Sequence, residues 1–297
     1  MSSQRGTLGE VTTSSKNRLV VVTGASTGMG AATARELARQ GFHVLAGVRR
    51  ESDGEAVRSG GVEPVVLDIT KPDHVAALVA RVDGDPLSRP LHALVNNAGV
   101  PGAGPVEATP LSQWRHLFEV NLFGHIAVTQ ALLPALRRGK GRVVNISSMN
   151  GKISMAGYGP YAGTKFALEA VSDALRQELA PQGVPVVIVE PGGVQTDMAA
   201  RGTSALHAAA DELTPEQEDL YRPLLRALPS HVAAFTKAGV TSAHAAERIA
   251  KTVTDRRPRI RYTIGRDAGM LLCLARFLPD RVLDRLLGAN LRPHFPA

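Results

Sequence analysis

The chain has 297 residues, of which 44% are hydrophobic and 4% aromatic, and its formal net charge is +7. This length is enough for one large α/β domain or two small ones, with a sizeable buried core. The positive charge would suit a nucleic-acid binder, but the basic residues are spread along the chain, and the aromatic residues are too few for a base-stacking platform. No nucleic-acid partner is therefore expected.

Short apolar runs rich in Val, Ile and Leu alternate along the chain with longer stretches of helical spacing. The apolar runs are continuous, as in strands that are buried on both faces of a parallel sheet. The expected strands are Leu19–Thr23, His43–Val48, Pro64–Leu67, Ala93–Asn96, Arg142–Ser147 and Pro185–Glu190. The expected helices are Ala31–Gln40, His74–Val82, Leu111–Arg137 and Ala162–Ala180. This alternation predicts an α/β fold with one Rossmann-type, doubly wound parallel sheet and helices on both of its faces.

The boundaries of this domain follow from changes in composition. Residues 1–17 are rich in Ser, Thr and Gly and lack the apolar core of a secretory signal, so we expect a disordered lead-in. Residues 18–297 contain no linker and are expected to form a single domain. No stretch reaches the about 18 consecutive apolar residues of a membrane-spanning helix, so no transmembrane segment is expected. The single cysteine, Cys273, excludes an intrachain disulfide and favours the reducing cytoplasm.

The part of the chain after Pro191 has a different character. Residues 199–240 are rich in Ala, Gly, Pro and charge, without a clear strand, and they follow the carboxyl end of a strand. We expect a substrate lid here, either a loop or helical, that buries little surface on its own and is mobile without ligand. Residues 241–297 are expected to form a C-terminal extension, amphipathic between Gly269 and Leu287. The Leu, Ala and Phe content of both segments favours an apolar substrate.

A glycine-rich segment, Thr23–Gly30, directly follows the first expected strand and opens the first helix. Glycines at such a turn let the backbone approach a pyrophosphate, which then lies at the helix N-terminus. The spacing is Gly-x3-Gly-x-Gly, through Gly24, Gly28 and Gly30, and differs from the general Gly-x-Gly-x-x-Gly pattern. The alternative is an ordinary turn between a strand and a helix.

The end of the second strand bears on the choice of dinucleotide. NAD sites place a carboxylate there for the ribose hydroxyls, whereas NADP sites accommodate the 2′-phosphate with an arginine. In this chain Val48 is followed by Arg49 and Arg50, with no carboxylate before Glu51. A guanidinium matches a phosphate through a planar pair of hydrogen bonds. The sequence therefore predicts NADP in preference to NAD, held by Arg49, with Arg50 as its substitute; the alternative is two solvated arginines.

A third signal is Tyr161 followed four residues later by Lys165. This spacing puts both side chains on one face of a helix. An ammonium beside a phenol favours the phenolate and lowers the tyrosine pKa towards a working value. Tyr161 is therefore a candidate general acid/base, although an isolated Tyr-x3-Lys pair is more often part of an ordinary amphipathic helix.

Taken together and in order, these motifs resemble those of the classical short-chain dehydrogenase/reductase family, from about residue 18 to residue 196. The resemblance also rests on Leu67-Asp68, Asn96-Asn97-Ala98-Gly99, Asn121, Ser147-Ser148, Pro191-Gly192 and Thr196. Residues 261–268 and 278–281 are similar, more loosely, to the branch that includes steroid- and retinol-type dehydrogenases. Gly163-Thr164 stands where Ala-Ser is usual before the lysine, which puts the local shape of the site in doubt and removes no reacting group.

The resemblance implies roles for individual residues. The implied catalytic residues are Asn121, Ser148, Tyr161 and Lys165, with Ser148 polarising the substrate oxygen and the Asn121 carbonyl holding a water that leads to Lys165. The implied cofactor-binding residues are Gly24, Ser26, Thr27, Gly28, Met29, Gly30, Arg49, Asp68, Ile69, Asn97, Ala98, Gly99, Tyr161, Lys165, Pro191, Gly192, Val194 and Thr196. No metal is expected, because no His, Cys and carboxylate cluster has ligand spacing.

The expected function is hydride transfer between a nicotinamide cofactor and the hydroxyl or carbonyl group of a small apolar molecule. The family resemblance implies a homodimer or homotetramer that is packed through helices Leu111–Arg137 and Ala162–Ala180. The rival class is a non-catalytic nucleotide sensor or scaffold on the same fold, since a fold does not imply a function. The identity of the substrate and the direction of the reaction stay open.

Overall fold

The computed structural model describes residues 17–210 and 213–295. Most of the predicted N-terminal lead-in, residues 1–16, lies outside these residues, as do residues 211–212 of the predicted lid.

The centre of the molecule is a seven-stranded sheet in which every neighbouring pair of strands is parallel. The strand order is β3-β2-β1-β4-β5-β6-β9. The bounds are Leu19–Val22 for β1, His43–Val48 for β2, Val62–Val66 for β3, Leu91–Asn96 for β4, Arg142–Ile146 for β5, Val186–Pro191 for β6 and Arg261–Ile264 for β9. This arrangement confirms the predicted doubly wound parallel sheet. The seventh strand, β9, is an addition that the sequence pattern did not predict.

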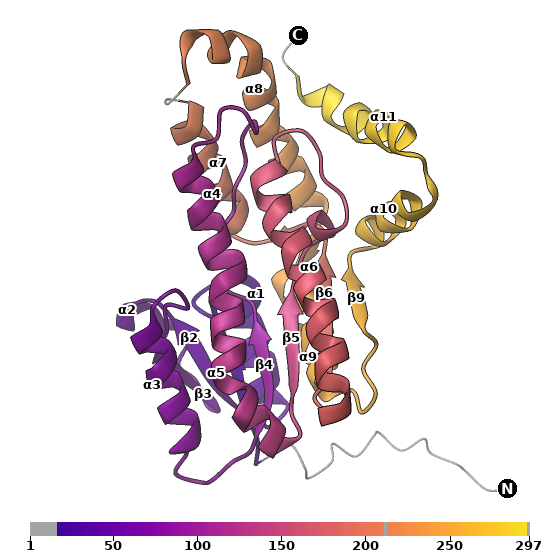
Figure 1. Ribbon diagram of the computed structural model, residues 1–297. Coiled ribbons are helices and arrows are strands. Elements are labelled where there is room, and N and C mark those ends of the chain that lie inside the picture. Colours follow the sequence, from indigo (N-terminus) through magenta and orange to yellow (C-terminus); the bar gives the residue numbers. More distant parts are fainter. Residues whose placement is uncertain (1–16, 211–212, 296–297) are drawn as a thin grey trace, which may run out of the picture.

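Helices cover both faces of the sheet, and each face has its own apolar core. Helices α1 (Gly28–Arg39) and α9 (Ser242–Thr254) bury Leu37 and Ile249 against one face. Helices α3 (Pro72–Asp83), α5 (Gly124–Gly139) and α6 (Gly159–Leu179) bury Leu78, Leu132 and Leu179 against the other; Figure 1 shows these three helices in front of the sheet. A short helix, α2 (Glu51–Val57), joins β2 to β3. Burial on both faces explains the unbroken apolar runs of the strands.

The helix that was predicted as Leu111–Arg137 is interrupted in the middle. It consists of α4 (Leu111–Phe118), a π-helical turn η1 (Glu119–Phe123) and then α5. A π-turn inserts one extra residue and shifts the main-chain hydrogen bonds. The interruption lies around Asn121, one of the candidate site residues.

The strand order reverses between β1 and β4, because β2 and β3 extend the sheet to one side while β5, β6 and β9 extend it to the other. In open α/β sheets such a switch point forms a crevice beyond the carboxyl ends of the strands. The loops that follow β1 and β4 meet there. They contain the glycine-rich segment and Asn97–Gly99.

The segment 199–240 is helical in the residues described, and it buries more surface than we expected. It forms α7 (Met198–Ala210) and α8 (Pro215–Ala238), with α8 running through Pro223 and Pro229. Leu206, Leu225 and Leu228 are buried together with Leu291 of α11 (Asp280–Leu291). The expectation that this segment buries little surface on its own is therefore wrong, because contacts between the two helices and with α11 supply an apolar cluster of their own.

The remaining elements join this upper part of the molecule to the sheet. Strand β7 (Val194–Gln195) pairs in parallel with β8 (Val240–Thr241), which ties the two ends of the α7–α8 segment together. After β9, α10 (Arg266–Phe277) and α11 stand beside α8, above the carboxyl ends of the strands (Figure 1). Short 3-10 turns follow β5 (η2, Met149–Gly151), α6 (η3, Ala180–Gln182) and α11 (η4, Arg292–His294). No helix among the described residues has both the length and the apolar character to cross a bilayer.

Candidate active site

The loop after β4 fixes the glycine-rich loop after β1. The Asn97 side-chain amide donates to the carbonyl oxygens of Thr23 and Gly24, each at 3.0 Å. The backbone N–H groups of Asn97 and Ala98 both donate to Thr23 Oγ1, each at 3.0 Å. Thr23 therefore joins the two loops, a role that the sequence analysis did not assign although Thr23 opens the motif.

Two of the glycines have the conformational freedom that this loop needs. Gly24 and Gly28 have φ angles of +62° and +55°, in the left-handed region that side chains disfavour. A Cβ on Gly24 would also lie 2.6 Å from the Cα of Ala98. A Cβ on Gly30 would collide with the Gly24 carbonyl oxygen and the Asn97 amide. The three glycines thus let the loop turn tightly and pack against its neighbour.

The residues around the loop fit a dinucleotide pyrophosphate. No side chain caps the N-terminus of α1 at Thr27, so its first N–H groups are placed to receive an anion. Ser26, Gly28 and Met29 are partly exposed there. The Thr196 side chain, beyond the end of β6, lies 3.2 Å from the position that a Gly28 Cβ would take. The structure therefore brings Thr196 next to the glycine-rich loop, and both were predicted to bind the cofactor.

The two arginines after β2 have different surroundings. Arg50 forms an ion pair with Asp53 at 2.8 Å. Arg49 is exposed, and no ion pair or hydrogen bond to its side chain is found among the described residues. Asp68 accepts hydrogen bonds from the Thr70 N–H and hydroxyl, at 3.0 and 2.7 Å; although burial works against it, these bonds lower the pKa of Asp68. Arg49 is thus the arginine that is available for a ligand.

The other predicted cofactor residues lie at or after the carboxyl ends of β3, β4 and β6. Ile69 is buried and lies directly under Gly124, where a Cβ would meet the Ile69 side chain. Gly99 lies against the Asn121 side chain. Pro191 ends β6 and is buried, whereas Gly192 and Val194 are partly exposed just after it. Their roles toward a cofactor stay predictions.

Ser148, Tyr161 and Lys165 converge at the end of β5. Lys165 is buried, and its Nζ donates to the carbonyl oxygen of Ile146 at 2.9 Å and lies 5.8 Å from the centre of the Tyr161 ring. Ser148 begins the turn η2, and its Oγ accepts from the Asn150 N–H at 3.1 Å. The neighbouring Ser147 hydroxyl is buried without a partner among the described residues. The sequence-predicted trio is therefore brought into one place.

The protonation of Tyr161 differs from our expectation. Burial raises the pKa of Tyr161 to about 12, and a hydrogen bond with Ser148 works in the opposite direction. Burial lowers the pKa of Lys165 to about 8. The expected lowering of the Tyr161 pKa by Lys165 is not found, because desolvation of the phenolate dominates and the ammonium is bonded to the Ile146 carbonyl. In this structure the phenol is protonated at neutral pH.

Asn121 is fully buried in the π-turn. Its side chain accepts from the Val100 N–H at 2.9 Å and donates to the Val100 carbonyl at 3.0 Å and to Thr164 Oγ1 at 3.3 Å. These bonds tie the loop after β4 to α6, which carries Tyr161 and Lys165. The shifted hydrogen bonds of a π-turn can leave a main-chain carbonyl without its helical partner, as the predicted water-holding role of Asn121 requires.

His125 is a buried residue that the sequence analysis missed. Its Nε2–H donates to the Ala98 carbonyl at 2.7 Å. Burial, together with the charge of Lys165, lowers the pKa of His125 to about 3, so it stays neutral and leaves Lys165 as the nearby cation. The only feature of the sequence that pointed to His125 as a site residue was its position one turn after Asn121.

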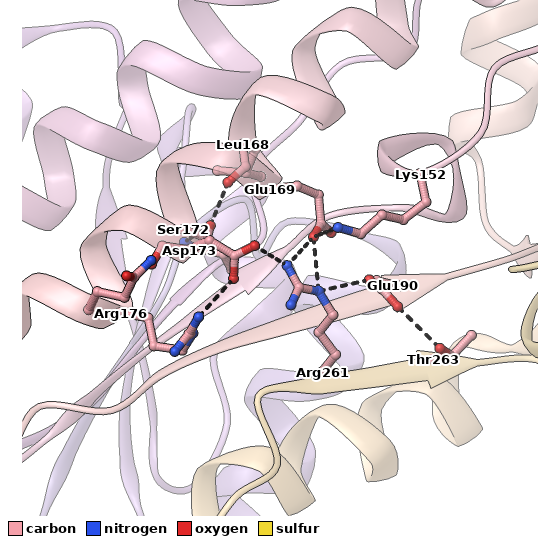
Figure 2. Close-up of polar contacts among 11 residues, drawn as sticks. Lys152, Leu168, Glu169, Ser172, Asp173, Arg176, Glu190, Arg261 and Thr263 are labelled. Carbon is pink, nitrogen blue, oxygen red and sulfur yellow. Dashed lines mark hydrogen bonds and ion pairs between the residues drawn. The ribbon is translucent and has the colours of Figure 1, made fainter. Parts of the chain in front are cut away.

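A network of charged side chains lies behind Lys165, and Figure 2 shows it between α6, β6 and β9. Glu169, one turn after Lys165 and buried, pairs with Lys152 at 2.9 Å and with Arg261 at 3.0 Å. Arg261 also pairs with Asp173 at 2.7 Å and Glu190 at 3.3 Å. Glu169 raises the pKa of Lys165 against the stronger effect of burial. The network therefore joins the loop after Ser148 to the helix that carries Lys165 and helps to keep Lys165 charged.

Replacing Glu169 with Gln should shift the pH dependence of activity. Without the carboxylate, the pKa of Lys165 falls below about 8. Lys165 is charged only below its pKa. As the pH is raised, activity that needs the ammonium should therefore disappear at a lower pH in Glu169→Gln than in the unmodified protein. The measurement is kcat/KM against pH. Asp173→Asn, in the same network, is the control and should leave the alkaline limb in place; an unshifted limb in Glu169→Gln would contradict the assignment.

A cavity of about 450 Å³ lies against the turn that follows Ser148. Its walls are mostly apolar, and Met149, Ile153, Phe235, Leu271, Leu286 and Leu287 belong to them. Tyr158, one turn before Tyr161, also lines it. A drug-sized ligand fits a cavity of this volume, so the cavity is a candidate substrate pocket beside the candidate catalytic residues.

Among residues 17–210 and 213–295 there is no group of three or more His, Cys, Asp and Glu side chains that could hold a metal ion.

Comparisons with known proteins place this geometry among related chains. The family model described as short chain dehydrogenase matches residues 18–207. The chain is 36% identical over 273 residues to the uncharacterized oxidoreductase YbbO of Escherichia coli strain K12, covering 90% of this chain and 93% of that protein. It is 35% identical over 287 residues to mouse retinol dehydrogenase 16, covering 92% of this chain and 88% of that protein.

Solved structures agree with the fold. A short-chain dehydrogenase from Streptomyces avermitilis has a TM-score of 0.72 and 30% identity, and the match covers 93% of this chain and 96% of that one. A short chain dehydrogenase from Burkholderia cenocepacia, solved with NADP, has a TM-score of 0.70 and 24% identity over 93% and 98% of the two chains. One from Burkholderia phymatum, solved with NAD, has a TM-score of 0.72 and 22% identity over 88% and 92% of the two chains. The last two show likeness of fold alone.

Proposed function

The chain belongs to the short-chain dehydrogenase family, and from this premise we propose that it transfers a hydride between a nicotinamide dinucleotide and the hydroxyl or carbonyl group of an apolar small molecule. The observation that carries the proposal is the meeting of Ser148, Tyr161 and Lys165 beside an apolar cavity. The experiment is a screen of neutral ketones and alcohols with the reduced and oxidised cofactors, followed at the nicotinamide absorbance. Absence of turnover with every compound would contradict the proposal.

The chemistry divides between the cofactor and the protein. When bound, the nicotinamide supplies or accepts the hydride. In reduction, the Tyr161 hydroxyl gives its proton to the substrate oxygen, and its raised pKa keeps it in the protonated form that can do so. Ser148 donates a hydrogen bond that polarises and orients the same oxygen. Lys165 binds the nicotinamide ribose, and its charge favours the phenolate that remains after proton transfer.

We propose NADP as the preferred cofactor, with NAD used less well. The support is the exposed Arg49 side chain after β2, which makes no hydrogen bond or ion pair among the described residues, while Arg50 is paired with Asp53. A guanidinium suits the 2′-phosphate of NADP, and no carboxylate stands before Glu51 to bind the ribose hydroxyls of NAD.

Replacing Arg49 with Asp should weaken NADP binding by about 10- to 100-fold, the loss of a charge-assisted hydrogen bond of about 1.5–3 kcal/mol. Binding of NAD should change much less, because it lacks the 2′-phosphate. The measurement is titration of each cofactor by intrinsic or nicotinamide fluorescence. Arg50→Asp is the matched control and should have the smaller effect. Equal or tighter binding of NAD by the unmodified protein would overturn the preference.

Two architectural predictions belong to the same proposal. We propose that residues 199–240 form a lid that excludes water from the crevice during hydride transfer; this is supported by their position directly after Thr196 and above the carboxyl ends of the strands (Figure 1).

We also propose a homodimer or homotetramer packed through α5 and α6. Phe123, Phe166 and Val171 on this surface are exposed, which supports a partner there.

The rival is a protein that binds the nucleotide without catalysis. The argument for this alternative is that the same fold serves many functions, and no particular residue supports it. The presence of Ser148, Tyr161 and Lys165 together favours the enzyme. A cytoplasmic location stays a prediction from the single cysteine.

A further inference from the structure

Besides Asn150, Ser154 and Tyr158 near the turn after Ser148, the mostly apolar cavity has a polar corner formed by His231 of α8, Asn290 of α11 and His294 of η4. His231 Nε2 lies 2.8 Å from Asn290 Oδ1. The His231 and His294 rings meet edge to face with their centres 5.2 Å apart. His294 Nδ1 is hydrogen-bonded to the Ser230 hydroxyl at 3.0 Å. Three separate elements thus bring hydrogen-bonding groups to one part of a mostly apolar wall.

The hydrogen-bonding capacity of this corner is only partly used. His231 is 6% exposed, and burial lowers its pKa, so the ring is neutral at neutral pH. Its Nε2–H then donates to Asn290 Oδ1, which leaves Nδ1 as an acceptor. Nδ1 is buried without a partner among the described residues, and none of them accepts from the Asn290 amide N–H groups. Because Nδ1 has almost no accessible surface, the groups that the corner offers to a hydroxyl oxygen are the Asn290 amide N–H groups, and the bond from His231 Nε2–H orients that amide.

The charge of the lining decides between a neutral and an ionised ligand. None of the described residues that line the cavity is Lys, Arg, Asp or Glu, and His231 is held neutral by burial. A carboxylate or ammonium in this cavity would lose its water without gaining a counter-ion, which is strongly unfavourable. An uncharged ligand meets no such penalty.

The near side of the same cavity adjoins the candidate catalytic groups. Met149 and Asn150 directly follow Ser148, and Tyr158 lies one turn before Tyr161. The Tyr158 and His231 rings meet edge to face, 6.5 Å between centres. Ser148 and Tyr161 do not themselves line the cavity, but a ligand that extends from them past Met149, Asn150 and Tyr158 would bring a second oxygen to the polar corner.

We propose that the substrate is an uncharged apolar ketone or secondary alcohol that carries a second hydroxyl group, hydrogen-bonded by the polar corner of His231, Asn290 and His294. This rests on the proposed function and adds a requirement that the reaction itself does not impose. The corner selects the hydroxyl-bearing substrate over a purely apolar one and excludes acids of the same skeleton.

The test uses methyl ketones with an apolar chain of increasing length that ends in a methyl, a hydroxymethyl or a carboxylate group. At the chain length that reaches the corner, kcat/KM should be about 5- to 12-fold higher for the hydroxyl-ended ketone than for the methyl-ended one, as for one hydrogen bond of about 1–1.5 kcal/mol. The carboxylate-ended ketone should be the poorest of the three. His231→Phe keeps a ring against Phe235. In this variant, and in Asn290→Leu, the ratio of kcat/KM for the hydroxyl-ended ketone to that for the methyl-ended one should fall close to one.

The same ligands are also compared by the rise in melting temperature that they give the protein with NADP, which needs no turnover. Hydroxyl-ended ligands should stabilise the unmodified protein more than methyl-ended ones, and His231→Phe should remove the difference. Equal effects of both ligands at every chain length, or an unchanged preference in His231→Phe, would overturn the subsite. Selective stabilisation without turnover of any ketone would support the subsite and contradict the proposed reaction.

Discussion

Replacing Tyr161 with Phe is expected to lower kcat by about two to four orders of magnitude, the usual cost of losing a general acid/base. The change keeps the ring and removes the hydroxyl whose proton passes to the substrate oxygen. Removing a hydroxyl from a partly buried ring should not unfold the protein, and NADP binding should change little, because the glycine-rich loop that is predicted to bind the pyrophosphate is unchanged. The measurement is kcat alongside the dissociation constant for NADP.

Tyr262 provides the matched control for this change. It lies on β9, and its hydroxyl is bonded to Asp255 at 3.0 Å and to the Arg259 N–H at 3.0 Å. Tyr262→Phe also removes a phenolic hydroxyl, yet it should retain turnover. Undiminished activity in Tyr161→Phe would contradict the role of Tyr161, and an equal loss in both variants would point to a general structural effect.

Gly30→Ala should abolish tight cofactor binding and destabilise the fold by about 1–3 kcal/mol, as overpacking does. The new Cβ would collide with the Gly24 carbonyl oxygen and the Asn97 amide, so that the loop after β1 and the loop after β4 must move apart. These are the two loops at the switch point of the sheet. The measurements are the urea midpoint and the dissociation constant for NADP.

Gly288 of α11 is the control for a helical glycine. A Cβ there would have nothing within 4 Å, so Gly288→Ala should stabilise the protein by about 0.5–1 kcal/mol through helix propensity. Normal NADP affinity in Gly30→Ala would show that the close approach of the two loops is not needed for the cofactor.

The parts of the fold that the sequence predicted are those fixed by local patterns. The apolar runs of β1, β2 and β5 need burial on both faces, and the glycines after β1 need positive φ angles or close packing. Each of these two requirements can be recognised from the residues of one short segment of the sequence. Strand β9 escaped prediction because it is a short strand at the edge of the sheet, with Arg261 and Thr263 partly exposed between buried residues.

The features that were missed depend on contacts between distant segments. The π-turn at Asn121 is held by bonds to Val100 and Thr164, which no local spacing reveals. Proline within a helix removes a main-chain hydrogen bond and usually breaks the helix. Helix α8 nevertheless continues through Pro223 and Pro229, because burial of its apolar residues against α7 and α11 outweighs the lost main-chain bonds.

The candidate site likewise has features that local spacing predicts and features that depend on contacts between distant segments. The positions of Ser148, Tyr161 and Lys165 could be read from motif spacing, and the structure brings them together. The pKa of Tyr161 could not be predicted from the sequence, because it depends on how deeply the folded chain buries the phenol. The same holds for Glu169 and Arg261, whose ion pair joins residues 92 positions apart.

The central claim is that the protein itself moves a hydride, and the most direct test follows that hydride with an isotope. NADPH carrying deuterium at the transferable position of the nicotinamide is incubated with the enzyme and a neutral apolar ketone, and the product alcohol is analysed by mass spectrometry. We expect one deuterium on the carbinol carbon, and no labelled product with Tyr161→Phe on the same timescale. Tight binding of the labelled NADPH with no deuterium in any product, across ketones of every chain length, would contradict it and identify a protein that binds the nucleotide without catalysis.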